Sequence, residues 1–463
     1  MKIYNTMTRQ KEELKPITDG IVKIYCCGPT VYNLIHIGNA RALCVFDTLR
    51  RYLEFRGYKV LYVQNFTDVD DKIIKKANEL GKTASEVSEN AIKEYFVDAQ
   101  GLNVRKADIH PKVTENMGII IDIVKTLIDK GYAYEADGDV YFETKKFPEY
   151  GKLSHMPLED LQAGARIEVG EKKRDPMDFA VWKAAKPGEP YWDSPFGKGR
   201  PGWHIECSAM SRHYIGDTID IHGGGSDLIF PHHENEIAQS ECATGSPLAN
   251  IWMHNGMLNV DNKKMSKSAG NFFMVRDLSD KYGYEPIRFM LLSVHYRSQL
   301  NYTIEVIESC KAALQRLYTC RDAMERVKSA AKDGEACAQT LEAVKTARAD
   351  FITAMDDDFN TADGISVLFE LVRKINSALA SPDVTKGDVA AYYDEFTALT
   401  NVLGLLYNKE NDDIPAEVTD LVEQRRAARK AKDFALADAL RDKITALGYT
   451  VEETRQGTIV KKA

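Results

Sequence analysis

The stretch from Cys26 to Ala40, CCGPTVYNLIHIGNA, places two adjacent thiols ahead of His36 and Gly38. Thiolates bind zinc and other soft metal ions. A glycine at the start of a helix lets a phosphate approach free backbone N–H groups, where His36 would stabilise developing charge. The stretch therefore indicates a metal site, a phosphate site, both of these, or only a strand that runs into a turn.

A second string, KMSKS, runs from Lys264 to Ser268 within NVDNKKMSKSAGN. Two lysines, two hydroxyl side chains and a nearby glycine are typical of a basic loop that closes on a polyphosphate and opens with its release. A solvated surface loop with no ligand is the alternative interpretation.

The third string is HGGGSD, in which His222 ends a predicted strand and residues 223–227 form a predicted turn before a helix. Three glycines would remove every Cβ where a base and a ribose approach the backbone. Asp227 could then accept hydrogen bonds from the ribose hydroxyls. A plain glycine-rich loop is the alternative.

Four residues scattered along the chain form a candidate metal set. His232 and Glu236 share one face of a predicted helix, while Cys27 and Cys207 come from other elements. Two thiolates, an imidazole and a carboxylate suit a tetrahedral zinc ion. Spacing alone leaves His204 and His233 as alternatives, although a helical His233 would point about 100° away from His232.

The elements that must position these residues follow an α/β pattern. Residues 21–28 form a short apolar run that predicts a buried strand, and a helix over 38–55 follows. Residues 58–68 predict a second buried strand, and 68–81 a capped helix ending at Gly81. Alternating strands and helices favour a Rossmann-type, doubly wound parallel sheet.

The pattern breaks in the middle of the chain. Residues 132–143 predict a hairpin that turns at Asp137-Gly138, and residues 186–202 are rich in glycine and proline. We interpret this part as an insertion between two halves of the sheet. A helix over 203–216, a strand over 218–222, and a helix with Pro231 in its first turn then resume the pattern.

After Tyr302 the apolar residues recur at helical spacing in four segments, which predicts a helical bundle. Beyond a polar linker, residues 425–448 predict one basic amphipathic helix, and residues 449–462 a hairpin turning at Gln456-Gly457. The predicted domain organisation is as follows: 1–118 and 203–250, the halves of the catalytic sheet domain; 119–202, the inserted connective segment; 251–302, the region that carries KMSKS; 303–409, the bundle; 410–463, a small mixed α/β domain.

Composition narrows the class of protein. The chain has 463 residues, 44% hydrophobic and 28% charged, with no apolar run of 18 residues and no amino-terminal apolar leader. We therefore expect a cytoplasmic protein outside the membrane, whose eight cysteines form no disulfide framework. We interpret four of them as buried hydrophobic residues: Cys44, Cys310, Cys320 and Cys337.

The net charge of −8 argues against indiscriminate binding to nucleic acid. From Leu421 to Ala463, however, ten Lys and Arg stand against six Asp and Glu, which gives this tail a charge of +4. A solvated helix face would account for that charge, and so would a nucleic-acid contact.

Taken in order, HIGN, GWHIECSAM, HGGGSDLIFPHHENEIAQSE and KMSKS resemble the cysteinyl-tRNA synthetases, which are class I aminoacyl-tRNA synthetases. The resemblance is dense from about residue 21 to 298. It implies that cysteine and Mg²⁺-bound ATP form cysteinyl-adenylate, and that the cysteinyl group passes to the 3′-terminal adenosine of tRNA(Cys). It also implies a monomer whose bundle and basic tail contact the tRNA.

The resemblance also assigns site residues by position. One Zn²⁺ would be held by Cys27, Cys207, His232 and Glu236. The catalytic residues would be His36, Lys264 and Lys267, and ATP would contact His36, Gly38, Asn39, Gly225, Asp227 and Lys267. Thr67, Trp203 and His222 would line the cysteine pocket. The chain departs from the family at Asn39, where a second histidine is usual and where asparagine cannot become cationic.

Two other functions share part of this pattern. A ligase that joins cysteine to an amino sugar uses the same activation chemistry but lacks an anticodon-binding region, so the residues after Tyr302 favour a tRNA substrate. A catalytically silent paralogue that only binds RNA is the other alternative. Intact lysines in KMSKS, an intact His36 and the complete metal set argue against it.

Overall fold

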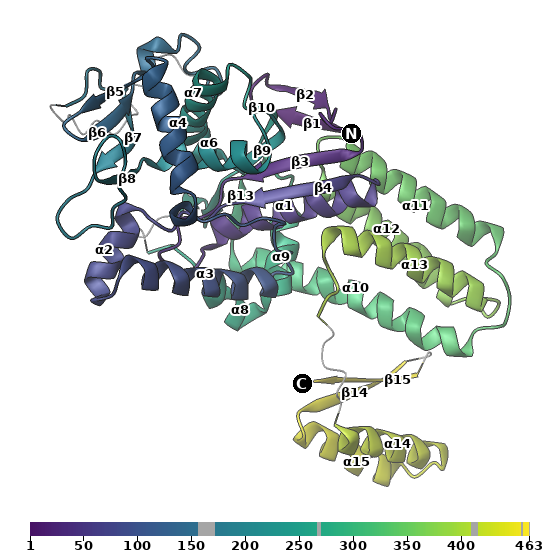
Figure 1. The fold of residues 1–463 in the computed structure, drawn as a ribbon. Coiled ribbons are helices and arrows are strands. Elements are labelled where there is room, and N and C mark those ends of the chain that lie inside the picture. The colour runs from purple at the N-terminus through teal and green to yellow at the C-terminus, as the bar shows by residue number, and fades with distance from the viewer. Residues whose placement is uncertain (156–171, 266–269, 409–414, 455–456, 463) are drawn as a thin grey trace.

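The computed structural model describes residues 1–155, 172–265, 270–408, 415–454 and 457–462 (Figure 1). Its centre is a sheet of four parallel strands in the order β10-β9-β3-β4. The strands are β3 (Ile21–Cys26), β4 (Lys59–Gln64), β9 (Ile219–Gly225) and β10 (Ala249–Asn255). The strand order changes direction between β3 and β9, so this is the switch point of a doubly wound sheet, as predicted.

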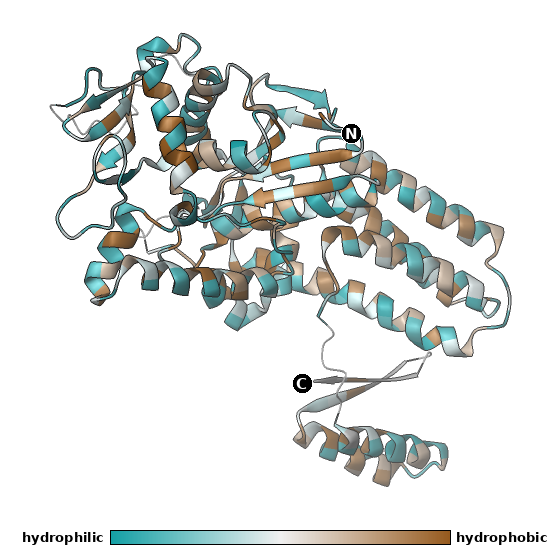
Figure 2. Cartoon of the chain, in the orientation of Figure 1, coloured by the Kyte–Doolittle hydropathy of each residue, from teal (hydrophilic) through white to brown (hydrophobic). Residues whose placement is uncertain are grey.

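Alternate residues of β3 face two separate apolar cores. Val22, Ile24 and Cys26 pack in the core that contains α1 (Ile37–Phe55) and the helical bundle. Tyr25 and Cys27 lie on the other face, in the core of α4 (Met117–Asp129), α6 (Trp203–Tyr214) and α7 (Glu234–Thr244). Figure 2 shows β3 and β4 as largely hydrophobic strands between these layers.

The first crossover follows the predicted pattern closely. α1 joins β3 to β4, and α2 (Asp71–Leu80) begins at Asp70, whose side chain accepts a hydrogen bond from the backbone of Lys72. Gly81 ends α2 in the left-handed conformation that glycine adopts without strain. α3 (Ala84–Gly101) then leads towards α4, with a short 3₁₀ segment at Val113–Glu115.

The insertion forms an antiparallel sheet in the order β5-β6-β7-β8. The predicted hairpin is present, because β5 (Ala133–Ala136) pairs with β6 (Asp139–Phe142) across Asp137-Gly138. β7 (Phe179–Ala184) and β8 (Gly199–Pro201) complete the sheet. Asp71 at the start of α2 contacts Lys183 and Arg200, so ion pairs attach this sheet to the catalytic domain.

Two predictions about the second half of the sheet are wrong. Residues 223–225, predicted as a turn, continue strand β9. The helix predicted to start with Pro231 begins at Glu234, because residues 229–233 form an irregular turn in which Phe230 is extended and the Phe230-Pro231 bond is cis. His232 and Glu236 nevertheless remain one helical turn apart.

After β10, the chain forms a three-stranded sheet and two short helices. β11 (Leu258–Val260) pairs with β12 (Lys263–Lys264) and with β13 (Leu300–Tyr302). α8 (Val275–Tyr282) and α9 (Tyr284–Leu292) lie between β12 and β13 in the chain. The strands β11 and β12 thus carry the chain into KMSKS, of which residues 266–268 lie outside the described part.

Four helices form the predicted bundle: α10 (Ile304–Ala330), α11 (Ala338–Asp356), α12 (Thr361–Leu379) and α13 (Lys386–Leu403). The bundle is joined to the start of the chain, since β1 (Lys2–Asn5), which pairs with β2 (Gln10–Glu13), meets the turn after α11. There Tyr4 donates its backbone N–H to the buried carboxylate of Asp358, at 2.8 Å.

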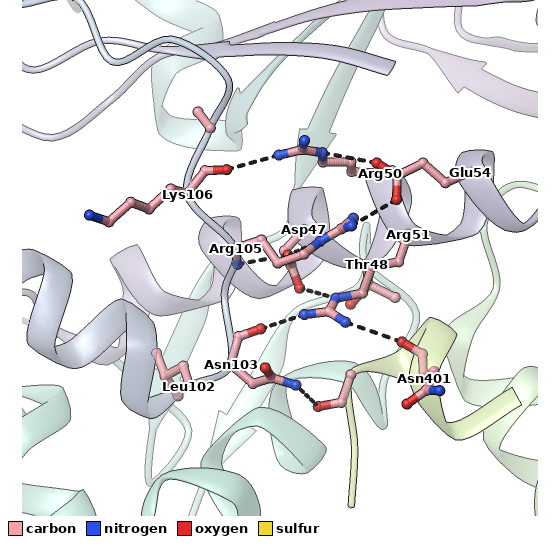
Figure 3. A network of polar contacts seen from close by, with 12 residues as sticks. Asp47, Thr48, Arg50, Arg51, Glu54, Leu102, Asn103, Arg105, Lys106 and Asn401 are labelled. Atoms are coloured by element: carbon pink, nitrogen blue, oxygen red, sulfur yellow. Dashed lines mark hydrogen bonds and ion pairs between the residues drawn. The ribbon is translucent and has the colours of Figure 1, made fainter. Parts of the chain in front are cut away.

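A buried polar network joins α1 to the bundle (Figure 3). Asp47 accepts hydrogen bonds from Arg51 Nε at 2.8 Å and from Arg288 Nη2 at 2.7 Å. Arg288 of α9 also donates to the carbonyl of Leu403 at the end of α13. Figure 3 shows Arg51 between Asp47 and the Asn103 and Asn401 carbonyls. The catalytic domain and the bundle are thus held together by buried charge as well as apolar packing.

The carboxy-terminal unit contains α14 (Ala416–Lys430), α15 (Phe434–Ala446) and an antiparallel pair, β14 (Tyr449–Thr454) and β15 (Gly457–Lys462). The single basic helix predicted here is wrong. The chain breaks at Lys432, whose φ is 62°, and the side chain of Asp433 caps α15. The hairpin is confirmed, although Gln456 of its predicted turn lies outside the described residues.

Among the described residues, no helix combines the length and apolar character that a membrane crossing requires. All eight cysteines are free. Cys44, Cys310 and Cys320 are buried as predicted, whereas Cys337 is exposed just before α11, so that prediction is wrong.

Candidate active site

A cavity of about 450 Å³ opens at the carboxyl ends of β3 and β9, beside the switch point of the sheet. Open α/β sheets bind ligands at this place. Eight predicted site residues line it: Cys27, His36, Gly38, Asn39, Trp203, Gly225, Asp227 and Lys264. Thr67, Cys207, His222, His232 and Glu236 are buried behind its wall. Lys267 lies outside the described residues.

His36 and Asn39 form the amino-terminal cap of α1. The backbone N–H of Asn39 donates to His36 Nδ1 at 3.2 Å, and the backbone N–H of His36 donates to Asn39 Oδ1 at 3.3 Å. Because Nδ1 is the acceptor, a neutral His36 ring carries its proton on Nε2 and can donate it to an anion. The asparagine in place of the second histidine therefore completes a capping box.

The chain that leaves KMSKS pairs with the same helix start. The Ile37 N–H donates to the Phe273 carbonyl at 3.1 Å, and the Val275 N–H donates to the Ile35 carbonyl at 3.0 Å. On the other side of the loop, the methyl group of Met265 lies 3.4 Å from the position that a Cβ on Gly38 would occupy. HIGN and both flanks of KMSKS therefore form one wall of the cavity.

The four candidate ligands converge on one point. Cys27 Sγ lies 3.6 Å from Cys207 Sγ, 3.4 Å from His232 Nε2 and 3.2 Å from Glu236 Oε1. His232 Nε2 lies 2.9 Å from Glu236 Oε1. Cys27 lines the cavity and is partly exposed, whereas Cys207, His232 and Glu236 are buried. A molecule in the cavity would therefore reach a metal ion held here from the side of Cys27.

A second set shares two of these residues. The donor atoms of His222, His233, Cys27 and Glu236 also lie within 4.8 Å of one another. His233 Nε2, however, is 3.9 Å from Glu236 Oε1, whereas His232 Nε2 is 2.9 Å from it. The geometry thus favours the set that contains His232.

Paired histidines surround the cluster. His232 Nδ1 lies 2.9 Å from His204 Nδ1, and Trp203 covers the His232 ring at a centroid distance of 4.3 Å. If Nε2 of His232 binds an ion, Nδ1 must carry the proton and donate it to His204. His222 Nε2 is 2.9 Å from Glu236 Oε2.

His233 in turn pairs with His254, which sequence analysis missed. The sequence pattern that could have identified His254 is the alternation in IWMHN, which puts Trp252 and His254 on one face of β10.

The buried groups of the cluster shift one another's pKa values. Burial opposes protonation of His232, but the Glu236 carboxylate raises its pKa to about 10. Burial would raise the pKa of Cys207, but hydrogen bonding from Cys27 and the charge of His232 lower it to about 6. Burial and the neighbouring Cys207 raise the pKa of Cys27.

The three glycines of HGGG serve different purposes. A Cβ on Gly223 would lie 2.2 Å from the Phe46 ring of α1, and one on Gly224 would lie 3.0 Å from the His233 ring. These two glycines accommodate the protein's own side chains. Gly225 alone lines the cavity, next to the Asp227 carboxylate, so the predicted role in approaching a nucleotide fits only this glycine.

Thr67 lies deeper than the resemblance suggests. It is buried, and its hydroxyl donates to Glu206 Oε2 at 2.9 Å. Burial raises the pKa of Glu206, and the neighbouring Cys207 raises it further. Glu206 was not identified from the sequence, although it stands next to Cys207 in GWHIECSAM.

The sequence was then compared with known proteins. A family model described as the class I (C) tRNA synthetase catalytic domain matches residues 13–312. A DALR domain matches residues 350–407, and a cysteinyl-tRNA ligase anticodon binding domain matches residues 411–459. The cysteine–tRNA ligase of Geobacillus thermodenitrificans (strain NG80-2) is 56% identical over 467 residues, with 100% of this chain and 99% of the relative covered.

The chain belongs to the cysteine–tRNA ligase family. The ligase of Clostridioides difficile (strain 630), another member, is 53% identical over 468 residues and is covered completely. The family resemblance inferred from HIGN, GWHIECSAM and KMSKS is therefore confirmed.

Solved structures show how widely this fold is shared. Mycobacterium tuberculosis methionyl-tRNA synthetase in complex with methionyl-adenylate superimposes with a TM-score of 0.59 at 14% identity, covering 83% of this chain and 89% of that one. Agrobacterium radiobacter K84 agnB2 leucyl-tRNA synthetase gives 0.60 at 11% identity, with 85% of each chain covered. The predicted α/β class with a helical carboxy-terminal part is thus confirmed.

Proposed function

We propose that this chain is a cysteine–tRNA ligase. It would activate L-cysteine with ATP to form cysteinyl-adenylate and transfer the cysteinyl group to the 3′-terminal adenosine of tRNA(Cys). The observation that carries this proposal is the convergence of two thiols, an imidazole and a carboxylate beside the cavity lined by HIGN and Lys264. The high identity to curated cysteine–tRNA ligases along the whole chain supports it.

Zinc suits the donors of this cluster. Zinc bonds of about 2.3 Å to sulfur and about 2.0–2.2 Å to nitrogen or oxygen give tetrahedral ligand separations of roughly 3.4–3.8 Å. The four separations given above run from 2.9 to 3.6 Å, slightly shorter than those of a filled site. A small outward movement of Glu236 and His232 would accommodate the ion. We assign Cys27, Cys207, His232 and Glu236 as its ligands.

The cluster would make the enzyme selective for cysteine over serine. The two amino acids differ little in size, so pocket shape alone discriminates weakly. When bound, zinc would take the substrate thiolate as a further ligand, which a serine hydroxyl replaces poorly. Trp203 closes the side of the pocket next to His232, and His222 holds the second oxygen of Glu236 in place.

Activation would proceed at the other end of the cavity. The cysteine carboxylate attacks the α-phosphorus of Mg²⁺-bound ATP, and pyrophosphate leaves. His36 and Gly38 line the cavity where negative charge would develop, so the His36 Nε2–H and the positive end of the α1 dipole would act by electrostatic stabilisation. Lys264 and Lys267 would neutralise the departing phosphates. Asp227 and Gly225 would hold the adenosine ribose.

The remainder of the chain supports a tRNA substrate. We assign the bundle and the basic carboxy-terminal unit to tRNA binding, in agreement with the anticodon binding domain matched at residues 411–459. Eight free cysteines fit a reducing cytoplasm, where we propose the enzyme acts as a monomer. The predicted domain boundaries stay part of this proposal.

Cysteine-dependent ATP–pyrophosphate exchange, followed by charging of a tRNA pool, tests the proposal. We expect exchange with cysteine and little with serine, and then cysteine-specific charging. Exchange without charging would indicate transfer to another acceptor such as an amino sugar, and no exchange would indicate a silent paralogue. Cys207→Ala should lose zinc and exchange, whereas Cys242→Ala, a buried free cysteine on α7 outside the cluster, should keep both. Persistent cysteine-specific exchange in Cys207→Ala would contradict the role of zinc.

A further inference from the structure

Arg41 is a fully buried cation immediately behind the wall of the nucleotide cavity. It lies on α1, five residues after His36, and its side chain is 0% exposed. Its guanidinium donates to the carbonyls of Gly256 at 2.8 Å and Met257 at 2.9 Å. It also donates to the carbonyl of Ser298 at 2.6 Å, and more weakly to that of His295 at 3.3 Å.

These carbonyls belong to the point where the catalytic sheet passes into the strands that lead to KMSKS. Gly256 and Met257 line the cavity between the end of β10 and the start of β11. The Ser298 carbonyl lies two residues before β13, the strand that pairs with β11. Arg41 therefore links the helix that starts at His36 to the base of the chain that carries Lys264.

The surroundings of Arg41 are unusual for a buried charge. Among the described residues, no carboxylate pairs with its guanidinium, and its Nε has no hydrogen-bond partner. Buried arginines are normally paired, because removing a charge from water is unfavourable. Arg288 illustrates the normal case, since it also donates to carbonyls but is paired with Asp47. A leucine or methionine would avoid this penalty but would remove the 2.6 Å donor to the Ser298 carbonyl, so the arginine serves to hold these carbonyls in place.

We propose that Arg41 is a positioning residue for the nucleotide, an inference that rests on the proposed ligase function. Arg41 fixes the incoming end of the KMSKS segment relative to α1. The pairing of Ile35 and Ile37 with residues 273–275 fixes the outgoing end. Both ends of the lysine-bearing loop are thereby held to the helix that presents His36. Loss of Arg41 would let the cavity widen on the side of Gly256 and Met257, while the metal cluster on the other face of the sheet is untouched.

The variants Arg41→Met and Arg41→Lys test this, with Arg288→Met as the matched control. Both arginines are fully buried and bind carbonyls, but the carbonyl partners of Arg288 lie at the junction with the bundle and line no part of the cavity, whereas Gly256 and Met257 do. Steady-state ATP–pyrophosphate exchange gives KM for ATP, KM for cysteine and kcat, and thermal unfolding gives the stability of each variant.

For Arg41→Met we expect kcat to fall about 100-fold and KM for ATP to rise about tenfold, the scale of an ångström-level misplacement. KM for cysteine should stay within about twofold, because the metal cluster is not disturbed. Arg41→Lys keeps a charge and three donors, so it should recover about tenfold of the lost kcat. Arg288→Met should unfold at a lower temperature with both KM values unchanged.

A second perturbation reaches the same connection between β10 and β11 without altering Arg41. In Gly256→Ala, the new Cβ would lie 2.4 Å from the Ser298 carbonyl oxygen, so the backbone must move. It should reproduce the rise in KM for ATP, even if Arg41→Met folds poorly. The proposal is overturned if the Arg41 and Gly256 variants change KM for ATP and KM for cysteine equally, or if their activity follows only the folded fraction. A wild-type chain without exchange would instead refute the ligase function itself.

Discussion

Replacement of Asp47 by asparagine tests whether buried charge holds the catalytic domain to the bundle. The Asp47 carboxylate accepts hydrogen bonds from Arg288 at 2.7 Å, from Arg51 at 2.8 Å and from the backbone of Arg105 at 3.0 Å. An asparagine oxygen keeps one or two of these bonds, but its amide group would face a guanidinium. The change leaves the fully buried Arg288 without its counter-charge.

The size of the effect follows from that geometry. Breaking a buried pair by removing one partner costs about 3–5 kcal/mol. The two charge-assisted hydrogen bonds to Asp47, at about 1.5–3 kcal/mol each, give a similar total. They describe the same interaction as the ion pair, so the two estimates are not added. Arg105 is more exposed and adds little. At roughly 2–4 °C per kcal/mol for a domain of this size, Asp47→Asn should lower the unfolding temperature by about 6–20 °C.

Scanning fluorimetry and urea titration measure this shift, with the midpoint reported because a chain of several domains does not unfold in two states. Asp383→Asn is the control, since Asp383 pairs with Lys332 on the surface, and we expect no shift. A decrease of less than about 2 °C for Asp47→Asn, or one equal to that of the control, would refute the reasoning.

The pH dependence gives an independent check. Burial opposes ionisation of Asp47, but Arg288 and Arg51 hold its pKa below the ordinary value. The carboxylate therefore stabilises the fold above the unfolded pKa of about 4, and that stability is lost as pH falls towards the lower folded value. The wild-type midpoint should fall more steeply below pH 5 than that of Asp47→Asn.

Three further substitutions have defined outcomes. Asn39→Ala removes the side-chain acceptor of the capping box and should lower stability by about 1 kcal/mol in urea titration. Asn39→Asp keeps an acceptor and should retain most of that stability. Equal loss of stability in the two variants would exclude capping as the role of Asn39. Gly223→Ala should lower the free energy of unfolding by about 1–3 kcal/mol, because the new methyl group overpacks against the Phe46 ring. Adding Phe46→Leu to this variant should recover part of the lost stability. No recovery would contradict the proposed contact. His204→Phe removes the acceptor for the Nδ1 proton of His232 and should weaken zinc binding about 10–100-fold in a chelator competition. Unchanged zinc affinity would mean that His204 does not orient His232.

Local signals predicted the first half of the sheet well. The apolar runs at 21–28 and 58–68 are long enough to specify buried strands, and Asp70 and Gly81 mark the two ends of α2 by ordinary capping chemistry. Adjacent residues of a strand point to opposite faces, and Cys26 and Cys27 accordingly lie in different cores. Burial raises the pKa of Cys26 to about 12, as expected for an inert thiol.

Errors arose where tertiary contacts override local preference. The glycines after His222 suggested a turn, but Gly223 extends a strand because the Phe46 ring needs its space. The stretch from 425 to 448 has helical spacing throughout, yet Asp433 starts a new helix there. Its polar side chain next to a lysine gave only a weak signal for a cap.

The candidate site was predicted unevenly for the same reason. Residue types and the family resemblance predicted one set of metal ligands: Cys27, Cys207, His232 and Glu236. In the structure their donor atoms lie close together. Nothing in the sequence marks Arg41 or Glu206 as buried, since arginine and glutamate are usually surface residues. Their partners are backbone carbonyls and a threonine hydroxyl, which no spacing rule reveals.

The contacts between the two ends of the catalytic domain and the bundle set an order for synthesis of the chain. Strand β1 meets the turn at Asp358, and Arg288 reaches the carbonyl of Leu403. The amino-terminal strand pairs with β2 early, but more than 350 residues must be made before it meets the turn at Asp357 and Asp358. A nascent chain that stalls before α13 would keep Arg288 paired with Asp47 but would lack the Leu403 carbonyl. The sheet domain would thus reach its final packing only after the bundle has been made.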